Sequence, residues 1–247
     1  MKTFFTALSL AALTTLPALA QDAASMSDAE RTALHAEIRT YLLENPEVLM
    51  EAIGVLEQRQ AEEKAAGDAA LVADNMDALI NDGMSWVGGN PEGDVTVVEF
   101  LDYRCGYCKR AFPEVAELIE SDGNIRFIVK EFPILGEQSL MASRYAIATH
   151  RIAGDEAYGD VHDALMAMSE EVTEDSLAEL SELLELDHEA ITAEMSAPEV
   201  DARIAASHQL AGKMSIQGTP SFVIGDELVR GYVPLEGMRE IVAGERG

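Results

Sequence analysis

The chain has 247 residues, of which 48% are apolar and 25% charged, a balance typical of a folded protein of one or two domains. This composition excludes a disordered tail, and two cysteines are too few for a disulfide-stapled miniprotein. Lysine and arginine total 17 against 45 aspartates and glutamates, so the net charge of −28 disfavours nucleic acids and anionic membrane surfaces as partners. The same charge attracts basic client proteins.

The first twenty residues have the layout of a secretory signal peptide. A short basic start, Met1-Lys2-Thr3, precedes a largely apolar stretch from Phe4 to Leu13 and the small-residue site Ala18-Leu19-Ala20. As a helix this stretch spans about 15 Å, roughly half of a bilayer core, which makes a retained membrane anchor the less favoured alternative. The sequence therefore predicts cleavage near Ala20 and a soluble mature chain in an oxidising compartment.

Two helices are predicted in the N-terminal region, residues 21–56. Ser27-Asp28-Ala29-Glu30 is a capping box, and the helix that it begins should run to about Glu44. Asn45 is expected to cap a second helix, with Pro46 at its first position. Two short helices bury little surface alone, so we expect this region either to self-associate or to fold back on the rest of the chain.

A bridging helix is predicted over residues 57–83. No large apolar side chain occurs from Glu57 to Asp68, a pattern typical of helices that cross solvent between domains. Apolar spacing resumes over 69–82, which should dock on the second domain. The residues Asn81-Asp82-Gly83 favour a turn and mark the predicted start of that domain, residues 84–247.

Residues 84–247 alternate strand and helix patterns and predict an α/β domain. The runs 95–101 and 125–129 are strands flanking a helix at 107–119, so the two strands should pair in parallel. Residues 137–211 are helical throughout, which is too long for a connection and predicts a helical insertion. A hairpin over 221–230 turns at Gly225-Asp226, and a last helix should run from Pro234 to Gly244.

The two cysteines, Cys105 and Cys108, follow the first of these strands in a CxxC arrangement. A bridge over so short a loop removes little unfolded-state entropy, so a purely structural disulfide is the less favoured interpretation, and structural zinc would need further ligands. Near a helix N-terminus the thiolate of Cys105 is favoured, and the nearby cations Arg104 and Lys109 should favour it further. We therefore predict Cys105 as the exposed nucleophile and Cys108 as the buried resolving thiol.

Glu99 is a further candidate, because it lies among apolar residues on one face of the strand that precedes the cysteines. If it is buried there, its pKa should rise, and it could exchange protons with Cys108; the alternative is a solvated face. Lys130, at the end of the next strand, is expected to be its partner.

The run VTVVEFLDYRCGYCKRAFPEV resembles the DsbA-like branch of the thioredoxin superfamily over most of residues 84–247. The resemblance implies a thioredoxin-like fold with a helical insertion, and buried acidic and basic positions at Glu99 and Lys130. It also implies a client-binding loop facing the cysteines at Gly218-Thr219-Pro220-Ser221, with Pro220 in the cis form. The backbone of Thr219 would pair with an extended client, and Pro220, Gly106 and Tyr107 would line the same site.

The N-terminal helices and Thr219 look more like the suppressor-of-copper-sensitivity (ScsC) and Com1-like members, some of which oligomerise and isomerise disulfides. Strongly oxidising members carry a histidine where Gly106-Tyr107 stands here, so an intermediate redox potential is expected.

These observations predict a periplasmic thiol:disulfide oxidoreductase, with isomerisation or reduction at least as favoured as oxidation. It would need no cofactor besides the redox-active Cys105–Cys108 disulfide. Its partners would be unfolded or misoxidised exported proteins and a membrane redox protein that recycles the cysteines. Further copies of the chain would be partners if the N-terminal helices self-associate rather than fold back. Two alternatives stay open: the thiols bind Cu(I) in a copper-handling or client-holding protein, or the N-terminal helices are the main interaction module.

Overall fold

The computed structural model describes residues 26–247, so the predicted signal peptide, residues 1–20, lies outside the described residues. Contacts divide the chain into two compact units, which meet between Gln58 and Arg59. Within the described part, none of the helices combines the length and the apolar character needed to cross a membrane.

Helix α1 (Asp28–Glu44) begins at the predicted capping box. The Glu30 carboxylate accepts the Ser27 N–H at 2.9 Å, and the Ser27 hydroxyl accepts the Glu30 N–H in return. The prediction that Asn45 caps the second helix is wrong. Its side-chain amide donates instead to the Tyr41 carbonyl at 2.9 Å, because the last carbonyls of α1 lack partners within the helix.

Helix α2 is continuous from Glu47 to Ile80, so the second N-terminal helix and the bridging helix of the sequence analysis are one element. The boundary between the two units falls inside α2, not at residue 83 as predicted from the turn at 81–83. The reason is that the last turns of α2 bury Val72 and Leu79 in the core of the second unit. Between residues 26 and 58, by contrast, no side chain is buried.

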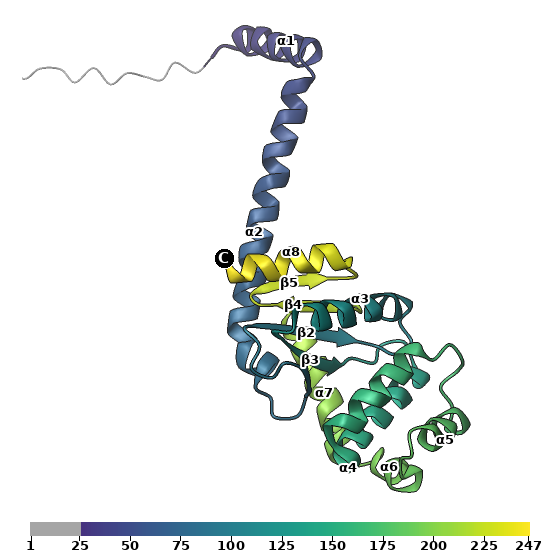
Figure 1. Ribbon diagram of the computed structural model, residues 1–247. Helices are drawn as coiled ribbons and strands as arrows, with labels where there is room; N and C mark the ends of the chain where they lie inside the picture. Colours follow the sequence, from purple (N-terminus) through teal and green to yellow (C-terminus); the bar gives the residue numbers. More distant parts are fainter. Residues whose placement is uncertain (1–25) are drawn as a thin grey trace, which may run out of the picture. The chain divides into compact units, whose positions relative to one another are not determined.

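The second unit contains a five-stranded sheet (Figure 1) in the order β1-β3-β2-β4-β5. Its strands are β1 (Trp86–Gly89), β2 (Val95–Leu101), β3 (Ile125–Glu131), β4 (Ser221–Ile224) and β5 (Glu227–Arg230). The predicted parallel pairing of β2 with β3 is confirmed, as is the β4–β5 hairpin. Strand β1 was not predicted; it pairs antiparallel with β3 and forms one edge of the sheet.

Six further helices complete this unit. They are α3 (Gly106–Asp122), α4 (Glu137–Ala167), α5 (Glu174–Leu183), α6 (His188–Glu194), α7 (Pro198–Lys213) and α8 (Leu235–Arg246). The predicted helical insertion over 137–211 is confirmed and consists of α4 to α7. Helix α8 starts directly after Pro234, as expected, but continues past Gly244 to Arg246.

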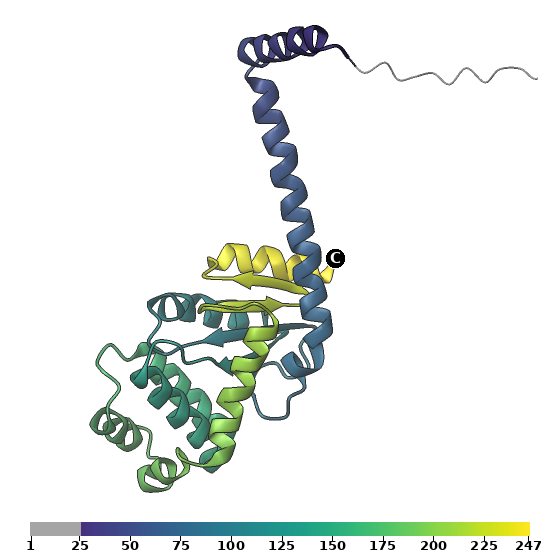
Figure 2. The ribbon, with the colours of Figure 1, turned by 180° about the vertical axis from the view of Figure 1, so that it is seen from behind.

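Successive side chains of β2 point to opposite faces of the sheet, and each face carries its own hydrophobic core. Val97 and Leu101 pack on one face with α3, α4 and α8. Val98 and Phe100 pack on the other with residues of α2 and α7. Figure 2 shows the end of α2 and α7 lying over this face of the sheet. This alternation decides which functional side chains can meet.

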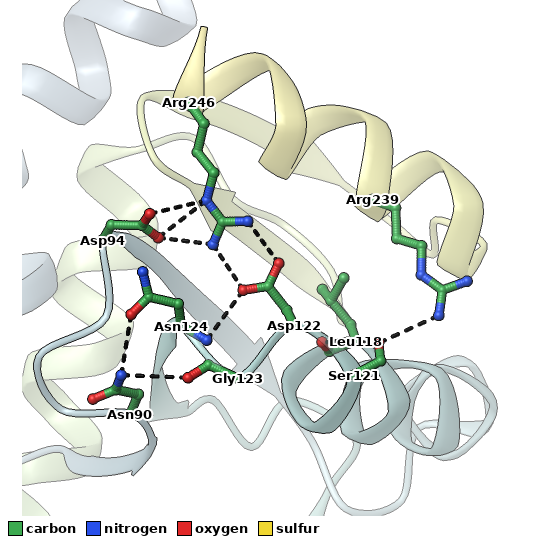
Figure 3. A network of polar contacts seen from close by, with 9 residues as sticks. All are labelled: Asn90, Asp94, Leu118, Ser121, Asp122, Gly123, Asn124, Arg239 and Arg246. Atoms are coloured by element: carbon green, nitrogen blue, oxygen red, sulfur yellow. Dashed lines mark hydrogen bonds and ion pairs between the residues drawn. The ribbon is translucent and has the colours of Figure 1, made fainter.

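Arg246, at the end of α8, links this helix to the start of β2 and the end of α3 (Figure 3). Its guanidinium donates to Asp94, directly before β2, at 2.7 Å and to Asp122, at the end of α3, at 2.7 Å. Because β2 runs from Val95 toward the cysteines, this network lies at the opposite end of the strand from them.

Candidate active site

The two cysteines lie where β2 gives way to α3. Cys105 is the N-cap residue of α3, and Cys108 lies in the first turn. Both are free thiols. Cys105 keeps 8% of its surface exposed and Cys108 none, so Cys105 is the more accessible thiol, although it is less exposed than the sequence analysis expects.

Several hydrogen-bond donors converge on the sulfur of Cys105. The largest effect comes from the Cys108 thiol, followed by the Thr219 side chain and by the backbone N–H groups of Cys108 and Tyr107. Against the opposing effect of burial, these donors lower the pKa of Cys105 to about 5. At neutral pH Cys105 is therefore a thiolate, the reactive form.

Arg104 and Lys109 are not among the largest influences on the pKa of Cys105, and their charged groups donate to backbone carbonyls, so their contribution to this thiolate stays a prediction. The Arg104 guanidinium donates to the Glu170 carbonyl at 2.7 Å. The Lys109 ammonium donates to the carbonyls at the end of α4, among them that of Leu165 at 3.1 Å. Lysine near a helix C-terminus is favoured by the helix dipole, so Lys109 links α3 to the insertion.

Glu99 is buried beneath the cysteines, so the solvated alternative for this residue is wrong. It is 3% exposed, and its Oε1 has no hydrogen-bond partner. Burial first, and then the Cys105 thiolate, raise the pKa of Glu99 to about 8. The carboxyl also lines a cavity of about 240 Å³ together with the aromatic side chains of Phe112 and His162.

Cys108 is held in its protonated form. Its hydrogen bond to Cys105, then burial, then the charge of Glu99 raise the pKa of Cys108 far above its ordinary value. A proton acceptor must therefore act before Cys108 can attack a disulfide.

The predicted pairing of Glu99 with Lys130 is wrong. In the register of β2 and β3, Glu99 lies opposite Val129 and Lys130 opposite Phe100, which places the two side chains on opposite faces of the sheet. Lys130 instead donates to Asp82 at 2.7 Å and to the Ala78 carbonyl of α2 at 2.9 Å. Lys130 therefore anchors the end of α2.

The loop that precedes β4 faces the cysteines. The Thr219–Pro220 peptide bond is cis, as the resemblance implies. The Cys105 sulfur lies 3.1 Å from the Thr219 carbonyl oxygen. Around this contact Pro220 is buried, whereas Gly106 is exposed and Tyr107 is 61% exposed. The loop, Gly106 and Tyr107 thus surround the nucleophile, and their contact with a client stays a prediction.

Asp102 is a site residue that the sequence analysis missed. Its fully buried carboxylate accepts backbone N–H groups from Arg104 at 2.8 Å and from Ile134 and Leu135 at 2.8 and 3.0 Å. Its own carbonyl accepts the Cys105 N–H at 2.9 Å. Asp102 therefore fixes the turn before α3 to the loop after β3. A signal was present, since an acidic residue directly follows a buried strand.

The described residues, 26–247, contain no group of three or more His, Cys, Asp or Glu side chains arranged to hold a metal ion. The chemistry that the arrangement supports is thiol–disulfide exchange, in which the Cys105–Cys108 pair reacts with the disulfide or dithiol of another molecule.

Replacing Asp82 tests the anchor of α2. Asp82→Ala leaves the buried Lys130 ammonium without its counterion and should lower the free energy of unfolding by about 3 kcal/mol, measured by urea denaturation. Burial of the Asp82 carboxyl acts to raise its pKa, but hydrogen bonds from Lys130 and nearby N–H groups outweigh burial and lower the pKa of Asp82 to about 2. The stabilisation is therefore complete above the ordinary pKa of 3.8 and lost as pH falls through 2. Asp77→Ala, in the last turn of α2, is the control; an equal loss there would contradict the assignment.

Replacing Glu99 tests the buried carboxyl. The folded pKa of about 8 lies above the ordinary value of 4.5, so wild type should lose stability relative to Glu99→Gln as pH rises between these values. The expected slope is about 1.4 kcal/mol per pH unit, from urea denaturation of both reduced proteins. Parallel stability curves across this range would show that Glu99 ionises normally.

Comparisons with known families agree with this geometry. The thioredoxin family model matches residues 81–243. The model of the copper resistance protein ScsC N-terminal domain matches residues 30–63. The chain spans about a quarter of the first curated relatives that it matches: Na(+)/H(+) antiporter NhaA 3 of Salinispora tropica is 30% identical over 156 residues, covering 63% of this chain and 24% of the antiporter.

Solved structures cover more of their own length. A thioredoxin-like oxidoreductase from Silicibacter pomeroyi is 45% identical with a TM-score of 0.65, covering 69% of this chain and 96% of that chain. ScsC of Proteus mirabilis in a transitional conformation is 28% identical with a TM-score of 0.65, covering 90% of this chain and 97% of that chain. The chain therefore belongs to the thioredoxin family, as a DsbA-like member of the ScsC type.

Proposed function

We propose that this protein is a periplasmic thiol:disulfide oxidoreductase that exchanges disulfides with exported client proteins. The observation that carries the proposal is the contrast between two neighbouring thiols. Cys105 ionises with a pKa of about 5 at the start of α3, whereas Cys108 stays protonated and fully buried behind it. Such a pair separates the attacking thiol from the resolving thiol.

In the first step the Cys105 thiolate attacks one sulfur of a client disulfide. A bond forms between Cys105 and that sulfur, the client disulfide breaks, and the other client sulfur leaves as a thiolate. The Thr219 backbone beside Cys105 supports this step, because an extended client segment can add to it as a strand. Affinity from main-chain hydrogen bonds suits a protein that accepts clients of many sequences.

In the second step Cys108 releases the client. The charge of the Cys105 thiolate helps to raise the pKa of Glu99, and the mixed disulfide removes that charge. Glu99 is then the stronger acid and ionises more readily, so its carboxylate can take the proton of Cys108. The Cys108 thiolate attacks Cys105, the client sulfur leaves as a thiolate, and the client has gained two electrons. The reverse sequence oxidises a client.

We further propose that isomerisation or reduction is at least as important as oxidation here. Gly106-Tyr107 supplies no charged side chain between the cysteines, and Arg104 and Lys109 are engaged with carbonyls. In an isomerisation, a second client thiol displaces Cys105 before Cys108 acts. Unfolded or misoxidised exported proteins would be the clients, and a membrane redox protein would restore the Cys105–Cys108 pair.

The N-terminal helices support self-association. Leu34, Ile38 and Tyr41 recur at spacings of four and three residues in α1, as Leu49, Ile53 and Leu56 do in α2, and all six are at least 44% exposed. This spacing is that of helices that pair along one apolar seam. Several nucleophiles held around one client would raise the effective concentration of Cys105.

Replacing the resolving cysteine tests the exchange chemistry. Cys108→Ala should accumulate a mixed disulfide between Cys105 and a client, detected by mass spectrometry of the non-reduced protein. The substitution also removes the main donor that lowers the pKa of Cys105, so trapping is measured at about pH 8. Cys105→Ala is the control and should trap nothing. If Cys108→Ala instead traps no client and wild type binds Cu(I) through both thiols, the copper alternative replaces this proposal.

Replacing two exposed isoleucines tests self-association in the full chain. Ile38→Glu combined with Ile53→Glu should lower the mass found by analytical ultracentrifugation to that of a monomer, since charges in an apolar seam repel and lose burial. The rate of refolding of a scrambled-disulfide substrate should fall with it. Ile152→Glu is the matched control, because Ile152 in α4 is 46% exposed, as Ile38 is. A monomeric wild type, or unchanged refolding by the double variant, would refute the role of these helices.

A further inference from the structure

Arg230, the last residue of β5, is bound to the segment that leads into the cis-proline loop. Its guanidinium Nη2 donates to the Met214 carbonyl at 3.1 Å, and its Nε lies 3.4 Å from the Ser215 carbonyl. These carbonyls lie directly after α7, and Met214 itself is fully buried. Arg230 therefore fixes the chain just before Gly218-Thr219-Pro220.

The backbone at Arg230 also fixes the chain after this loop. Arg230 is the register partner of Ser221, the first residue of β4. The next residue, Gly231, donates its N–H to the Pro220 carbonyl at 3.0 Å. One short stretch of β5 thus holds both ends of the loop whose Thr219 carbonyl contacts Cys105.

The outer side of the Arg230 guanidinium is bound by Asp68 of α2. The contact is bidentate, with Nη1 to Oδ2 at 2.7 Å and Nη2 to Oδ1 at 2.8 Å. Paired hydrogen bonds of this kind fix the plane of the guanidinium as well as its position. The Asp68 side chain is 13% exposed, so the pair is shielded more than an ordinary surface ion pair.

Asp68 also marks where α2 first packs against the second unit. Every residue of α2 from Arg59 to Gly67 is exposed, and Asp68 is the first half-buried residue of the part of α2 that belongs to the second unit. A displacement of α2 at this point would therefore reach Arg230 directly, and through it the loop. Farther along the helix the buried Val72 and Leu79 hold α2 to the sheet independently.

We propose that Asp68 is a positioning residue for client binding: through Arg230 it sets the geometry of the cis-proline loop and makes client affinity depend on how α2 is seated. The inference rests on the proposed function, because it assigns a use to the client-binding backbone at Thr219. Without the Asp68 charge, only the Met214 and Ser215 carbonyls hold the guanidinium, so the segment before the loop is fixed less firmly. A client held by main-chain hydrogen bonds is sensitive to such a shift, whereas a small disulfide that touches only Cys105 is not.

The test compares two disulfide substrates in the full chain. One is a labelled peptide disulfide, and the other is dithiobis(nitrobenzoate), which has no peptide backbone. Asp68→Asn should raise the KM for the peptide by about fivefold or more and lower the ratio of peptide to small-disulfide rates accordingly. Asp68→Glu, which restores a carboxylate, should recover most of the ratio.

The matched control is Asp94→Asn, which removes a carboxylate from the Arg246 network at the other end of β2 (Figure 3). Its ratio should equal that of wild type, and melting temperatures identify any general loss of stability in either variant. An unchanged ratio in Asp68→Asn, or an equal fall in Asp94→Asn, would overturn the inference. The proposed function would still stand in that case, provided that wild type exchanges disulfides with both substrates. If wild type exchanges with neither substrate, the proposed function fails, and this inference fails with it.

Discussion

The hydrogen bond between the two thiols is the interaction on which the rest of the site depends. It is the largest single influence on the pKa of Cys105 and of Cys108, and it acts in opposite directions on them. A shared proton stays on the buried sulfur, and the accessible sulfur carries the charge. The start of α3 adds backbone N–H groups to the same sulfur, so the helix and the buried thiol support one thiolate together.

Glu99 on β2 and Lys130 on β3 are both buried, but the pleat of the strands places them on opposite faces of the sheet, where they have different surroundings. On one face Glu99 lies under the cysteines without a cation and is held largely protonated. On the other face Lys130 binds Asp82 and the end of α2. Lys130 pairs with Phe100, one position beyond Glu99, and side chains alternate between faces along each strand. Lys130 therefore reaches α2, whereas Glu99 stays on the face of the cysteines.

The long helix α2 belongs to both units of the chain. Its first part has exposed apolar side chains, whereas its last turns are anchored by Val72, Leu79 and the acceptors of Lys130. Asp68 lies at the transition between these parts and contacts Arg230 of β5, the strand next to the cis-proline loop.

Local chemistry in the sequence determined much of this protein. Ser27 and Glu30 specify the start of α1, the apolar run at 95–101 specifies the central strand, and CxxC after that strand specifies the thiol pair, because these signals act within a few residues. The short strand β1 was missed, since Trp86-Val87-Gly88-Gly89 contains two glycines and is held mainly by its pairing with β3. Contacts between distant segments, such as Lys130 with Asp82 and Arg230 with Asp68, were decided only by the tertiary structure. The partner of a buried charged side chain depends on the strand register and on how α2 and the loops pack around the sheet. No local sequence pattern encodes these.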